Sequence, residues 1–421
     1  MSQKQFNQKL LGIKDLNIEI DDVQAKKSSF YAWGHLTYSL TVCPHCGANT
    51  IVRNGFKLTN IRLLPTQEKP TVLKLKKQRY LCKTCHHSTM AKTSLVDSDR
   101  QISHNIDQAI MLMLTEDQSL TAIAQHLNVS VVTVNRVMMR LGRQTSPVLD
   151  RLPVALCFDE FRSVNHQMSF IAIDANSHEL LTLLPDRCTR TIEDYFLHNY
   201  SANSRAQVKY VSVDFNANYF RLIKRLFPNA KIVADHFHLV QMILRAVDQT
   251  RVQLMKKFST DTREYRLFKS AWKLFLKYSA DLETQSPRWF NRLRDRLTQE
   301  QVVMEGLSID QTFEQTYNIA HTLLKTLNTT DIASLATLLK TTNLVSPQLQ
   351  EVLKAFKAHK EAILTMMDPS VHYSNGPIEG VNRKVKQIKR TAYGYRNWSH
   401  FRMRIQIQFK FRVKKRNPIR K

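Results

Sequence analysis

Runs of hydrophobic and polar residues divide the chain into four regions. Residues 1 to about 100 carry short runs separated by polar turns, as in β-strands, and residues 101–150 carry helical periodicity. From residue 151 to about 240, short apolar runs alternate with helical stretches, and long amphipathic helices follow from about 241 to 372. A final basic stretch, to Lys421, closes the α/β pattern. The pattern predicts an α/β multidomain protein, with a boundary near Pro147 and Pro153.

Five apolar runs of the third region have the length and composition of buried strands. In order, they are VALCFDEF, MSFIAIDAN, ELLTLLP, VKYVSVDF and KIVADHFH. Two helical stretches, TIEDYFLHNY and NANYFRLIKRLFPNA, precede the fourth and fifth of these strands. The resulting order, β-β-β-α-β-α-β, predicts a mixed sheet with helices on its faces.

Two of these predicted strands end in an aspartate. Asp159 ends the first run and Asp214 ends the fourth. If the two strands are neighbours, both carboxylates meet at one edge of the sheet, where hard oxygen ligands bind Mg²⁺ or Mn²⁺. Such a site suits two-metal phosphoryl transfer. Asp159 is followed by Glu160, and because side chains alternate across a strand, only one of these two should face the metals.

The charge balance of the chain indicates which class of molecule it binds. Lys and Arg number 62 against 35 Asp and Glu, which gives a formal net charge of +27 and a pI near 9.9. Nucleic acid is the expected polyanion, because its phosphates release counterions on binding Lys and Arg. Charge for solubility alone is the weaker explanation. The sequence has no run of about 18 apolar residues and no signal-peptide pattern, so we expect a protein that does not bind membranes and is cytoplasmic or, in a eukaryote, nuclear.

Two CxxC pairs lie in the first region. Cys43 and Cys46 stand in CPHC, and Cys82 and Cys85 stand in CKTC, with one or two β-hairpins predicted between the pairs. Two such turns complete a tetrahedral S4 site for structural zinc, although two unrelated reduced pairs remain the alternative. A sulfur can also be replaced by one of the nearby histidines, His45, His86 or His87. The sequence therefore predicts a zinc-binding module in residues 1–100, with basic surroundings suited to phosphate contacts.

A helix-turn-helix is predicted in residues 101–150. An apolar stripe from Leu120 to Leu127 is followed by Asn128, which tolerates the left-handed backbone of a tight turn, and by Ser130, which can cap the next helix. A second apolar stripe consists of Val131, Val134, Val137 and Met138. The alternative is an ordinary pair of packed helices.

Polar side chains on the second helix are the candidates for reading DNA. We expect them to point outward, where they reach base edges and phosphates in a major groove. They are Thr133, Asn135, Arg136 and Arg140.

The C-terminal part of the chain closely resembles the ISL3 family of bacterial insertion-sequence transposases. The resemblance is carried by SNGPIEGVNRKVKQIKRTAYGYRNWSHFRMRIQ, with its Ser-Asn-Gly segment, a glutamate, then Asn, spaced basic residues, Tyr-Gly and an Asn-x-x-x-Phe-x-x-Arg ending. The positions that match this pattern are Ser374, Asn375, Gly376, Glu379, Asn382, Lys389, Arg390, Tyr393, Gly394, Asn397, Phe401 and Arg404. The sheet order is also similar to the RNase H-like fold of DDE transposases and integrases. The resemblance covers nearly the whole chain, because the cysteine module, the helix-turn-helix and the catalytic region follow the family's order.

The resemblance implies a catalytic triad and a domain plan. Asp159 matches the first aspartate, Asp214 the second, and Glu379 the final glutamate on a C-terminal helix. It implies an RNase H-like catalytic domain in residues 151–421, holding two Mg²⁺ or Mn²⁺ ions at the triad. The stretch 241–372 looks like the all-α insertion that some DDE transposases carry. Similar proteins often have two adjacent aspartates at the first position, where this chain has Glu160 after Asp159.

A D-x-x-H arrangement follows the fifth predicted strand. Related transposases carry a similar element near the active site, which makes Asp235, His236 and His238 secondary candidates. Asp235 is either an auxiliary ligand beside Asp214 or a helix N-cap with histidines packed nearby.

The basic residues after Glu379 are candidates for DNA contact. Cations next to a metal site can bind phosphates, and the interleaved aromatics Tyr393, Tyr395 and Trp398 can stack on exposed bases. The alternative is a solvated charged helix face. The basic residues are Arg383, Lys384, Lys386, Lys389 and Arg390.

Three functions compete at this point. The leading hypothesis is a transposase that binds the terminal inverted repeats of its element and catalyses Mg²⁺-dependent cleavage and strand transfer. It acts on double-stranded DNA, both element ends and target, as at least a dimer when assembled on DNA, in a bacterial cytoplasm in association with the nucleoid. The alternatives are a zinc and helix-turn-helix regulator on a catalytically inactive scaffold, and a nuclease of the same fold without strand transfer.

Overall fold

The computed structural model describes residues 3–144, 151–340 and 345–410. Pro147 and residues 411–421, which include the end of the expected basic stretch, lie outside this part of the chain. Contacts between residues divide the chain into two compact units. The first holds residues 1–147, 163–165 and 383–421, and the second holds residues 148–162 and 166–382.

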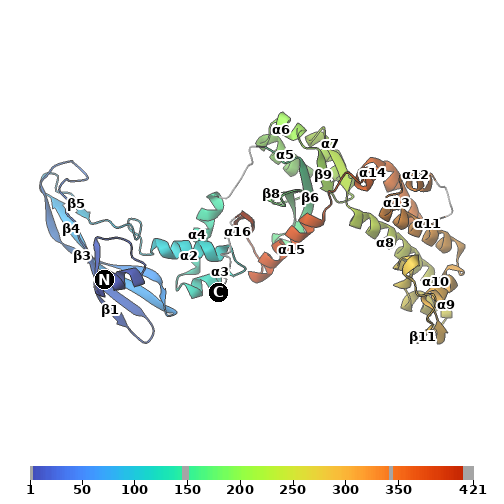
Figure 1. The fold of residues 1–421 in the computed structure, drawn as a ribbon, viewed down its shortest axis with the longest axis horizontal. Coiled ribbons are helices and arrows are strands. Elements are labelled where there is room, and N and C mark those ends of the chain that lie inside the picture. The colour runs from blue at the N-terminus through green and yellow to red at the C-terminus, as the bar shows by residue number, and fades with distance from the viewer. Residues whose placement is uncertain (1–2, 145–150, 341–344, 411–421) are drawn as a thin grey trace, which may run out of the picture. The chain divides into compact units, whose positions relative to one another are not determined.

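The first unit begins with a sheet built around one long hairpin (Figure 1). Its strands are β1 (Ile18–Ala25), β2 (Phe30–Leu36), β3 (Ile51–Thr66), β4 (Lys69–Cys82) and β5 (Ser88–Met90), preceded by helix α1 (Gln3–Leu10). The order is β1-β2-β4-β3, with β5 paired to β4. Gln67 and Glu68 join β3 to β4 with positive φ angles of 51° and 61°, as a two-residue hairpin turn requires. One hairpin therefore fills the stretch where one or two were expected.

The helix-turn-helix of the first unit has the predicted elements. They are α2 (His104–Leu114), α3 (Leu120–His126) and α4 (Val131–Gln144). Asn128 has φ of 52° in the turn between α3 and α4, and the Ser130 hydroxyl accepts a hydrogen bond from the Thr133 N–H at 3.2 Å. These two polar residues set the turn and begin the second helix, as their side-chain chemistry predicts.

A fourth helix completes the core of the helix-turn-helix. Helix α16 (Trp398–Lys410) contacts α4 and α2, and Ile407 of α16 is fully buried in the same core as Ile110 and Val134. The Arg404 guanidinium, 2% exposed, donates to the backbone carbonyls of Glu116 and Gln118, in the turn before α3, at 2.8 and 2.6 Å. The last described helix of the chain thus packs against a domain that begins 300 residues earlier.

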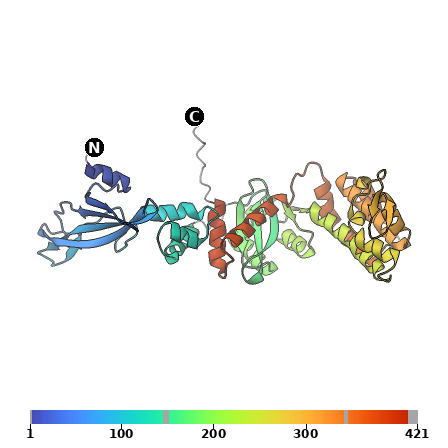
Figure 2. The same ribbon diagram turned by 90° about the horizontal axis from the view of Figure 1, so that it is seen from below.

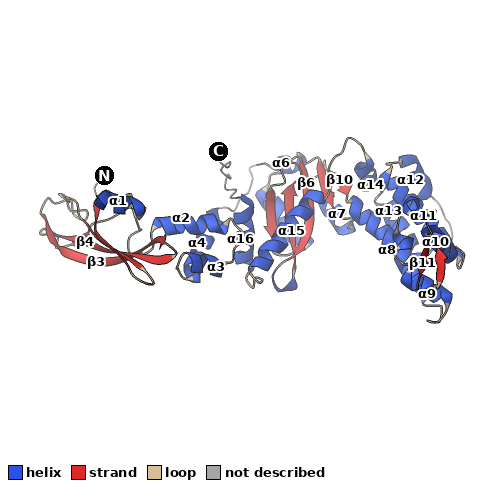
Figure 3. Ribbon diagram, turned by 60° about the horizontal axis from the view of Figure 1, so that its bottom comes forward, coloured by secondary structure: helices blue, strands red, loops and turns tan. Residues whose placement is uncertain are grey.

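The second unit contains a five-stranded mixed sheet (Figure 3). Its strands are β6 (Ala155–Arg162), β7 (Met168–Asp174), β8 (Leu180–Leu184), β9 (Tyr210–Val213) and β10 (Lys231–Ala234), in the order β10-β9-β6-β7-β8. Strands β6, β7 and β8 form an antiparallel meander, whereas β9 and β10 run parallel to β6. Helices α5 (Thr189–Asn199), the short α6 (Ala202–Ala206) and α7 (Ala217–Leu226) form the connections. This is the predicted order of elements with one extra helical turn.

Strand β6 continues past Asp159, so the expectation that it ends at this residue is wrong. Its parallel pairing with β9 stops at Phe158 opposite Val213, but its antiparallel pairing with β7 continues to Arg162 opposite Met168. The backbone hydrogen bonds with β7 keep the strand extended after β9 has ended.

A helical part follows β10 (Figure 2). Its helices are α8 (His236–Met255), α9 (Arg263–Ser270), α10 (Gln299–Leu307), α11 (Gln311–Asn328), α12 (Ile332–Leu338), α13 (Pro347–Ala358) and α14 (Lys360–Met367). A small hairpin, β11 (Arg288–Phe290) with β12 (Asp295–Leu297), and the 3₁₀ turns Leu274–Leu276 and Ser279–Asp281 interrupt them; a further 3₁₀ turn, Val164–His166, follows β6. The unit ends in α15 (Gly376–Thr391), whose last residues, from Arg383, group with the first unit.

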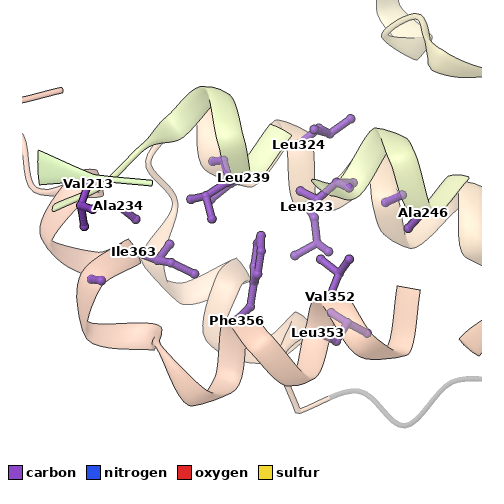
Figure 4. Close-up of a cluster of buried hydrophobic side chains, with 14 of the residues drawn as sticks. Val213, Ala234, Leu239, Ala246, Leu323, Leu324, Val352, Leu353, Phe356 and Ile363 are labelled. Carbon is purple, nitrogen blue, oxygen red and sulfur yellow. The ribbon is translucent and has the colours of Figure 1, made fainter. Parts of the chain in front are cut away.

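One hydrophobic core joins the sheet to the helical part. Val213 of β9 and Ala234 of β10 are buried in the same cluster as Leu239 of α8, Phe356 of α13 and Ile363 of α14 (Figure 4). The helical part is therefore fixed to the β10 side of the sheet, next to the ends of the strands that carry the aspartates.

Candidate active site and DNA-binding elements

Three aspartates lie in one row where the parallel pairing of neighbouring strands ends. Phe158 of β6 pairs with Val213 of β9, which pairs with Ala234 of β10. The next residue on each strand is Asp159, Asp214 and Asp235, in the same order. The register thus brings together the two aspartates predicted as ligands and adds the third beside them.

Helix α15 contacts both predicted aspartates through asparagine side chains. The Asn382 Nδ2 donates to Asp159 Oδ2 at 2.6 Å, and the Asn375 Nδ2, at the residue before the helix, donates to Asp214 Oδ1 at 3.1 Å. Both asparagines are buried. Sequence reasoning placed them in the family pattern but gave them no role, although their spacing of seven residues was a signal that they share a helix face.

Glu379 lies on the same face of α15 as these asparagines. It is four residues after Asn375 and three before Asn382, the spacing at which helical side chains are neighbours. Its side chain is half-buried, and its N–H donates to the Asn375 carbonyl at 3.1 Å. Among the described residues, neither Asp159 nor Glu379 belongs to a ligand group as tight as the one formed by Asp214, Asp235 and His238.

Asp235 is the N-cap of the helix that follows it, and it also lies beside Asp214. Its carboxylate caps α8 by accepting from the His238 N–H at 3.2 Å, and it also lies 3.1 Å from His238 Nδ1. The same nitrogen is 3.2 Å from Asp214 Oδ1, so the ligand atoms of all three residues lie within 4.8 Å of one another. His236 is half-buried and outside this group.

Burial disfavours the ionised forms of Asp159 and Asp214. Burial, and then the neighbouring charge of Asp214, raises the pKa of Asp159 to about 7. Burial also raises the pKa of Asp214, against the opposing effects of His238 and Asn375. The hydrogen bond to Asp235 raises the pKa of His238. The site therefore has excess negative charge that only a cation or protons can balance.

Glu160 faces other partners than the aspartate row. Its carboxylate accepts from Arg187 Nη1 at 2.6 Å and from the Tyr219 hydroxyl at 2.9 Å. Burial and the Glu160 charge raise the pKa of Tyr219. Asp159 and Glu160 both border a hollow of about 410 Å³, together with Asp214 and His238. The charge of Glu160 is already balanced by Arg187, which leaves Asp159 as the ligand candidate of the two.

The four cysteines of the first unit converge. Cys43 Sγ lies 3.8 Å from Cys85 Sγ, Cys46 Sγ lies 3.7 Å from Cys82 Sγ, and all four sulfurs lie within 4.8 Å of one another. The backbone N–H of Cys85 is the main cause that lowers the pKa of Cys82 to about 6, which favours the thiolate that binds metal.

The two cysteine turns have matching backbones. In each, the residue after the second cysteine, Gly47 or His86, donates its N–H to the carbonyl of the first cysteine at 2.9 Å and has a positive φ. The rings of His45 and His87 stack on each other at 4.5 Å, and the tight ligand group contains sulfur alone. The turns thus form a closed four-sulfur site that suits structural zinc.

Helix α4 presents only part of the predicted polar set outward. Arg136 is exposed and Asn135 is half-buried. Thr133 was expected to point outward but is 7% exposed. It lies in the first turn of α4, where it hydrogen-bonds to the hydroxyl of the capping residue Ser130 at 2.9 Å. Arg140 is partly occupied by an ion pair with Asp107 of α2 at 2.7 Å.

Val131 was predicted to belong to the apolar stripe of α4, and this is wrong. It is 42% exposed, since it lies at the first position of the helix, before the stripe turns toward the core. Val134, Val137 and Met138 are buried as expected.

The basic residues of α15 differ in their exposure and in their contacts. Lys389 donates to the Ser163 carbonyl, and Lys384 donates to the Gln408 carbonyl at 3.1 Å with its Nζ over the Phe409 ring. Arg383, Lys386 and Arg390 are exposed, as is Lys384.

The aromatic residues after α15 also differ in exposure. Tyr393 is 99% exposed, whereas Tyr395 stacks on Phe401 at 4.8 Å and Trp398 is half-buried. Of the three, only Tyr393 has a fully exposed ring.

Within the described residues, no helix is long and apolar enough to cross a membrane. This agrees with the absence of long apolar runs in the sequence.

Comparison with protein families gives matches along nearly the whole chain. A model of ISL3-type DDE proteins, described as "Transposase", matches residues 156–405. A zinc finger of the transposases of IS204, IS1001, IS1096 and IS1165 matches residues 39–85. A helix-turn-helix domain of transposase family ISL3 matches residues 91–142. The order of zinc ribbon, helix-turn-helix and DDE region is the predicted one.

Individual proteins add to this result. The transposase for insertion sequence element IS1001 of Bordetella parapertussis is 23% identical over 391 residues, which is 89% of this chain and 90% of the relative. A Lactococcus lactis subsp. lactis protein named ATP-dependent protease is 31% identical over 121 residues, 28% of this chain and 38% of its own length.

Among solved structures, the Drosophila P element transposase strand transfer complex matches with a TM-score of 0.36 at 12% identity, over 78% of this chain and 94% of that one. That score is too low to support any conclusion. The family matches are sufficient to assign the chain to a family, since the first match covers more than half of its residues. The chain belongs to the ISL3 family of insertion-sequence transposases, DNA-processing enzymes with a zinc ribbon and a DNA-binding helix-turn-helix.

Proposed function

We propose that this transposase cuts and joins DNA with divalent metal ions held by Asp159, Asp214 and Glu379. The observation that carries the proposal is the contact of α15 with the aspartate row. Asn382 binds Asp159 and Asn375 binds Asp214, and Glu379 lies between the two asparagines on the same helix face. The two contacts lie on either side of Glu379 in the sequence, which supports Glu379 as the third ligand.

The donor set suits Mg²⁺ or Mn²⁺. All three proposed ligands are carboxylates, the ligand type that hard divalent cations prefer. The raised pKa of Asp159, due to burial and to Asp214, is the mark of carboxylates that need a nearby cation to ionise together. When bound, such ions activate the attacking hydroxyl and stabilise the leaving oxygen of phosphoryl transfer.

The surrounding side chains hold the ligands in place. The amides of Asn375 and Asn382 each fix one carboxylate oxygen by hydrogen bonds, which orients the other oxygen. His238, held by Asp235, lies 3.2 Å from Asp214 Oδ1 and favours the charged form of Asp214. Arg187 keeps Glu160 neutralised beside the site. These contacts fix the carboxylates before substrate arrives, which lowers the reorganisation needed for catalysis.

The DNA-binding modules supply the substrate to this site. The zinc ribbon and the helix-turn-helix are proposed to bind the terminal inverted repeats of the element, with Arg136 as the exposed base-reading candidate on α4. Cleavage leaves a 3′-hydroxyl at each element end, which then attacks target DNA in line. Because two ends react together, we propose at least a dimer on DNA.

An excision assay tests this proposal. A marker flanked by the element's ends is placed on a plasmid, and the protein is supplied in trans as wild type, as Asp214→Asn, or as Asp194→Asn. Asp194 is an exposed carboxylate of the same unit, outside the row, and controls for the loss of one charge. We expect excision with wild type and Asp194→Asn and none with Asp214→Asn. Excision by Asp214→Asn would overturn the proposed site, and end binding without excision by wild type would favour the regulator.

A further inference from the structure

A basic cavity lies behind the candidate active site, between α7, β10 and the start of α14. Its volume is about 630 Å³. The basic residues that border it come from all of these elements and from the end of α13: Arg221, Lys224, Lys231, Lys357 and Lys360. No role has been given to these residues above.

The cavity has an excess of positive charge. Glu361 is the one acidic residue of its lining, and it lies 3.8 Å from Lys224. Asp368 lies outside the lining. Its hydrogen bonds with Ser370 lower its pKa, and the charge of Lys231 adds a smaller effect in the same direction. Burial and the Lys224 charge lower the pKa of His359, which also borders the cavity. Five cations against one lining carboxylate leave a net charge that favours an anion.

A helix terminus adds to this potential. Helix α14 begins at Lys360, and its N-cap residue, His359, makes no side-chain capping hydrogen bond. The first N–H groups of a helix carry partial positive charge and bind phosphate oxygens well. Lys360 and Glu361 of this first turn border the cavity, so the helix terminus and the lysines act on the same volume.

Three aromatic rings form a wall shared by the cavity and the candidate active site. Phe215 follows Asp214 and borders the acidic hollow. Its ring contacts Phe220 at 5.5 Å and His359 at 5.6 Å, and both of these residues border the basic cavity. The acidic and the basic hollows therefore lie on either side of one packed cluster within the second unit.

Helix α7 runs from one hollow to the other. Asn216, its N-cap, borders the acidic hollow, and Arg221 and Lys224, further along the helix, border the basic cavity. The rise from Asn216 to Lys224 is roughly 12 Å at 1.5 Å per residue. A DNA strand rises about 3.4 Å per nucleotide, so about four nucleotides cover this length.

We propose that the cavity bordered by Arg221, Lys224, Lys231, Lys357 and Lys360 binds the DNA backbone a few nucleotides from the phosphate that reacts at the aspartate row. The proposal rests on the proposed function, since it concerns the DNA on which that site acts. Lysines and an arginine on four elements hold the phosphates without reading sequence. The contact positions the strand along α7 with its reacting phosphate at the carboxylates.

Lysine footprinting tests the location of the contact. The full-length protein is mixed with the supercoiled plasmid of the excision assay, in Ca²⁺ to prevent cleavage, and lysines are acetylated and identified by mass spectrometry. We expect DNA to slow the modification of Lys231, Lys357 and Lys360. Exposed lysines of the same unit that do not border the cavity serve as internal controls and should react equally with and without DNA: Lys256, Lys257 and Lys340.

The same experiment with inorganic pyrophosphate in place of plasmid distinguishes the ligand. Protection of the cavity lysines by plasmid and not by pyrophosphate at equal phosphate concentration supports a DNA backbone site. Protection by pyrophosphate alone would overturn the proposal in favour of a small-anion site. Equal modification with and without bound plasmid would also overturn it.

A variant gives an independent measurement. The triple change Lys231→Gln, Lys357→Gln and Lys360→Gln removes three phosphate contacts, which predicts a fall of about 2.7 in the slope of log K against log salt. The matched control is Lys256→Gln, Lys257→Gln and Lys340→Gln, with the same loss of charge and a smaller change of slope. Equal slopes for the two triples would contradict the proposal.

The two proposals fail separately in these experiments. Excision retained by Asp214→Asn removes the proposed catalytic site but leaves the footprint meaningful, because footprinting needs no catalysis. Unprotected cavity lysines, with excision still dependent on Asp214, remove the DNA site alone.

Discussion

The side-chain amide of Asn382 donates a 2.6 Å hydrogen bond to Asp159, although 223 positions separate the two residues in the sequence. The bond is one of the causes that lower the pKa of Asp159, against the larger effect of burial, which raises it to about 7. Asp159 must be ionised to hold a cation, so activity at limiting Mg²⁺ should rise as pH increases through neutrality. Its carboxylate is protonated below this pKa and ionised above it.

Replacing Asn382 by Ala should shift this rise to higher pH and increase the Mg²⁺ concentration needed for half-maximal cleavage. The reason is that Asp159 loses a donor that favours its charged form. The measurement is the cleavage rate as a function of pH at several Mg²⁺ concentrations. If both the pH profile of the cleavage rate and the Mg²⁺ requirement stay unchanged, Asn382 does not act through Asp159.

Glu379→Gln should lower the cleavage rate by about a hundredfold or more and leave binding to element ends intact. The amide keeps the shape of the side chain but loses the charge of the third proposed ligand. Cleavage and end binding are measured on the same preparation. Glu351→Gln, which changes an exposed residue of α13, is the control and should retain both activities. Loss of end binding in Glu379→Gln would indicate a structural role instead.

Cys82→Ser should release zinc from the first unit and weaken DNA binding. The hydroxyl is a poor ligand, and the remaining three sulfurs leave an incomplete site. Metal content is measured by mass spectrometry of the purified protein, with Cys188→Ser as the control because the exposed Cys188 lies outside the sulfur group. Zinc content equal to that of wild type would argue against the four-cysteine site.

Gly142→Ala should destabilise the packing of α16 on α4. A Cβ at this position would lie 2.5 Å from Met403 Cγ and 2.7 Å from Met403 Cβ, so α16 must shift. We expect a loss of about 1–3 kcal/mol in the stability of the first unit, measured by thermal unfolding.

Two further variants check this explanation of Gly142. Met403→Ala in the same chain should restore part of the lost stability, since it removes the contact with Met403 Cγ and leaves the contact with Met403 Cβ, and the two changes should not be additive. Gly380→Ala on α15, where nothing lies within 4 Å of a new Cβ, should be neutral or stabilising by up to about 1 kcal/mol. Additive losses for Gly142→Ala and Met403→Ala would contradict the contact.

His321 should make the helical part less stable in acid. Burial lowers its pKa, its Nε2 donates to the Phe275 carbonyl at 3.3 Å, and its Nδ1 is buried without a hydrogen-bond partner among the described residues. A histidine with a lowered folded pKa takes up protons more readily when unfolded. Stability is therefore complete above the unfolded pKa of about 6.5 and decreases as pH falls below it. In His321→Gln this part of the pH dependence should disappear from the unfolding transition; an identical pH dependence in both proteins would exclude His321 as its source.

Local patterns were sufficient to predict the elements that carry the site. The apolar runs before Asp159 and Asp214 predicted two buried strands, and the parallel register places both residues directly after the last pair. The cysteine spacing predicted the four-sulfur group in the same way. These features follow from residues close together in sequence, which periodicity and spacing describe well.

Contacts between distant residues were not predictable from such patterns. The pairing of Glu160 with Arg187, 27 positions apart, depends on how β6 faces the start of α5. The contact of Arg404 with the turn before α3 joins residues 288 positions apart, and nothing in the local sequence of either segment indicates the other.

The packing of α16 in the helix-turn-helix core has a consequence for synthesis on the ribosome. Residues 104–144 leave the ribosome well before Ile407, which fills their core, has been made. Until then the apolar surface that α16 covers on α4 stays exposed. The nascent chain thus acquires a finished DNA-binding domain only after its proposed catalytic residues, including Glu379, have been made, so a product of translation interrupted before Ile407 lacks the complete domain with which to occupy DNA.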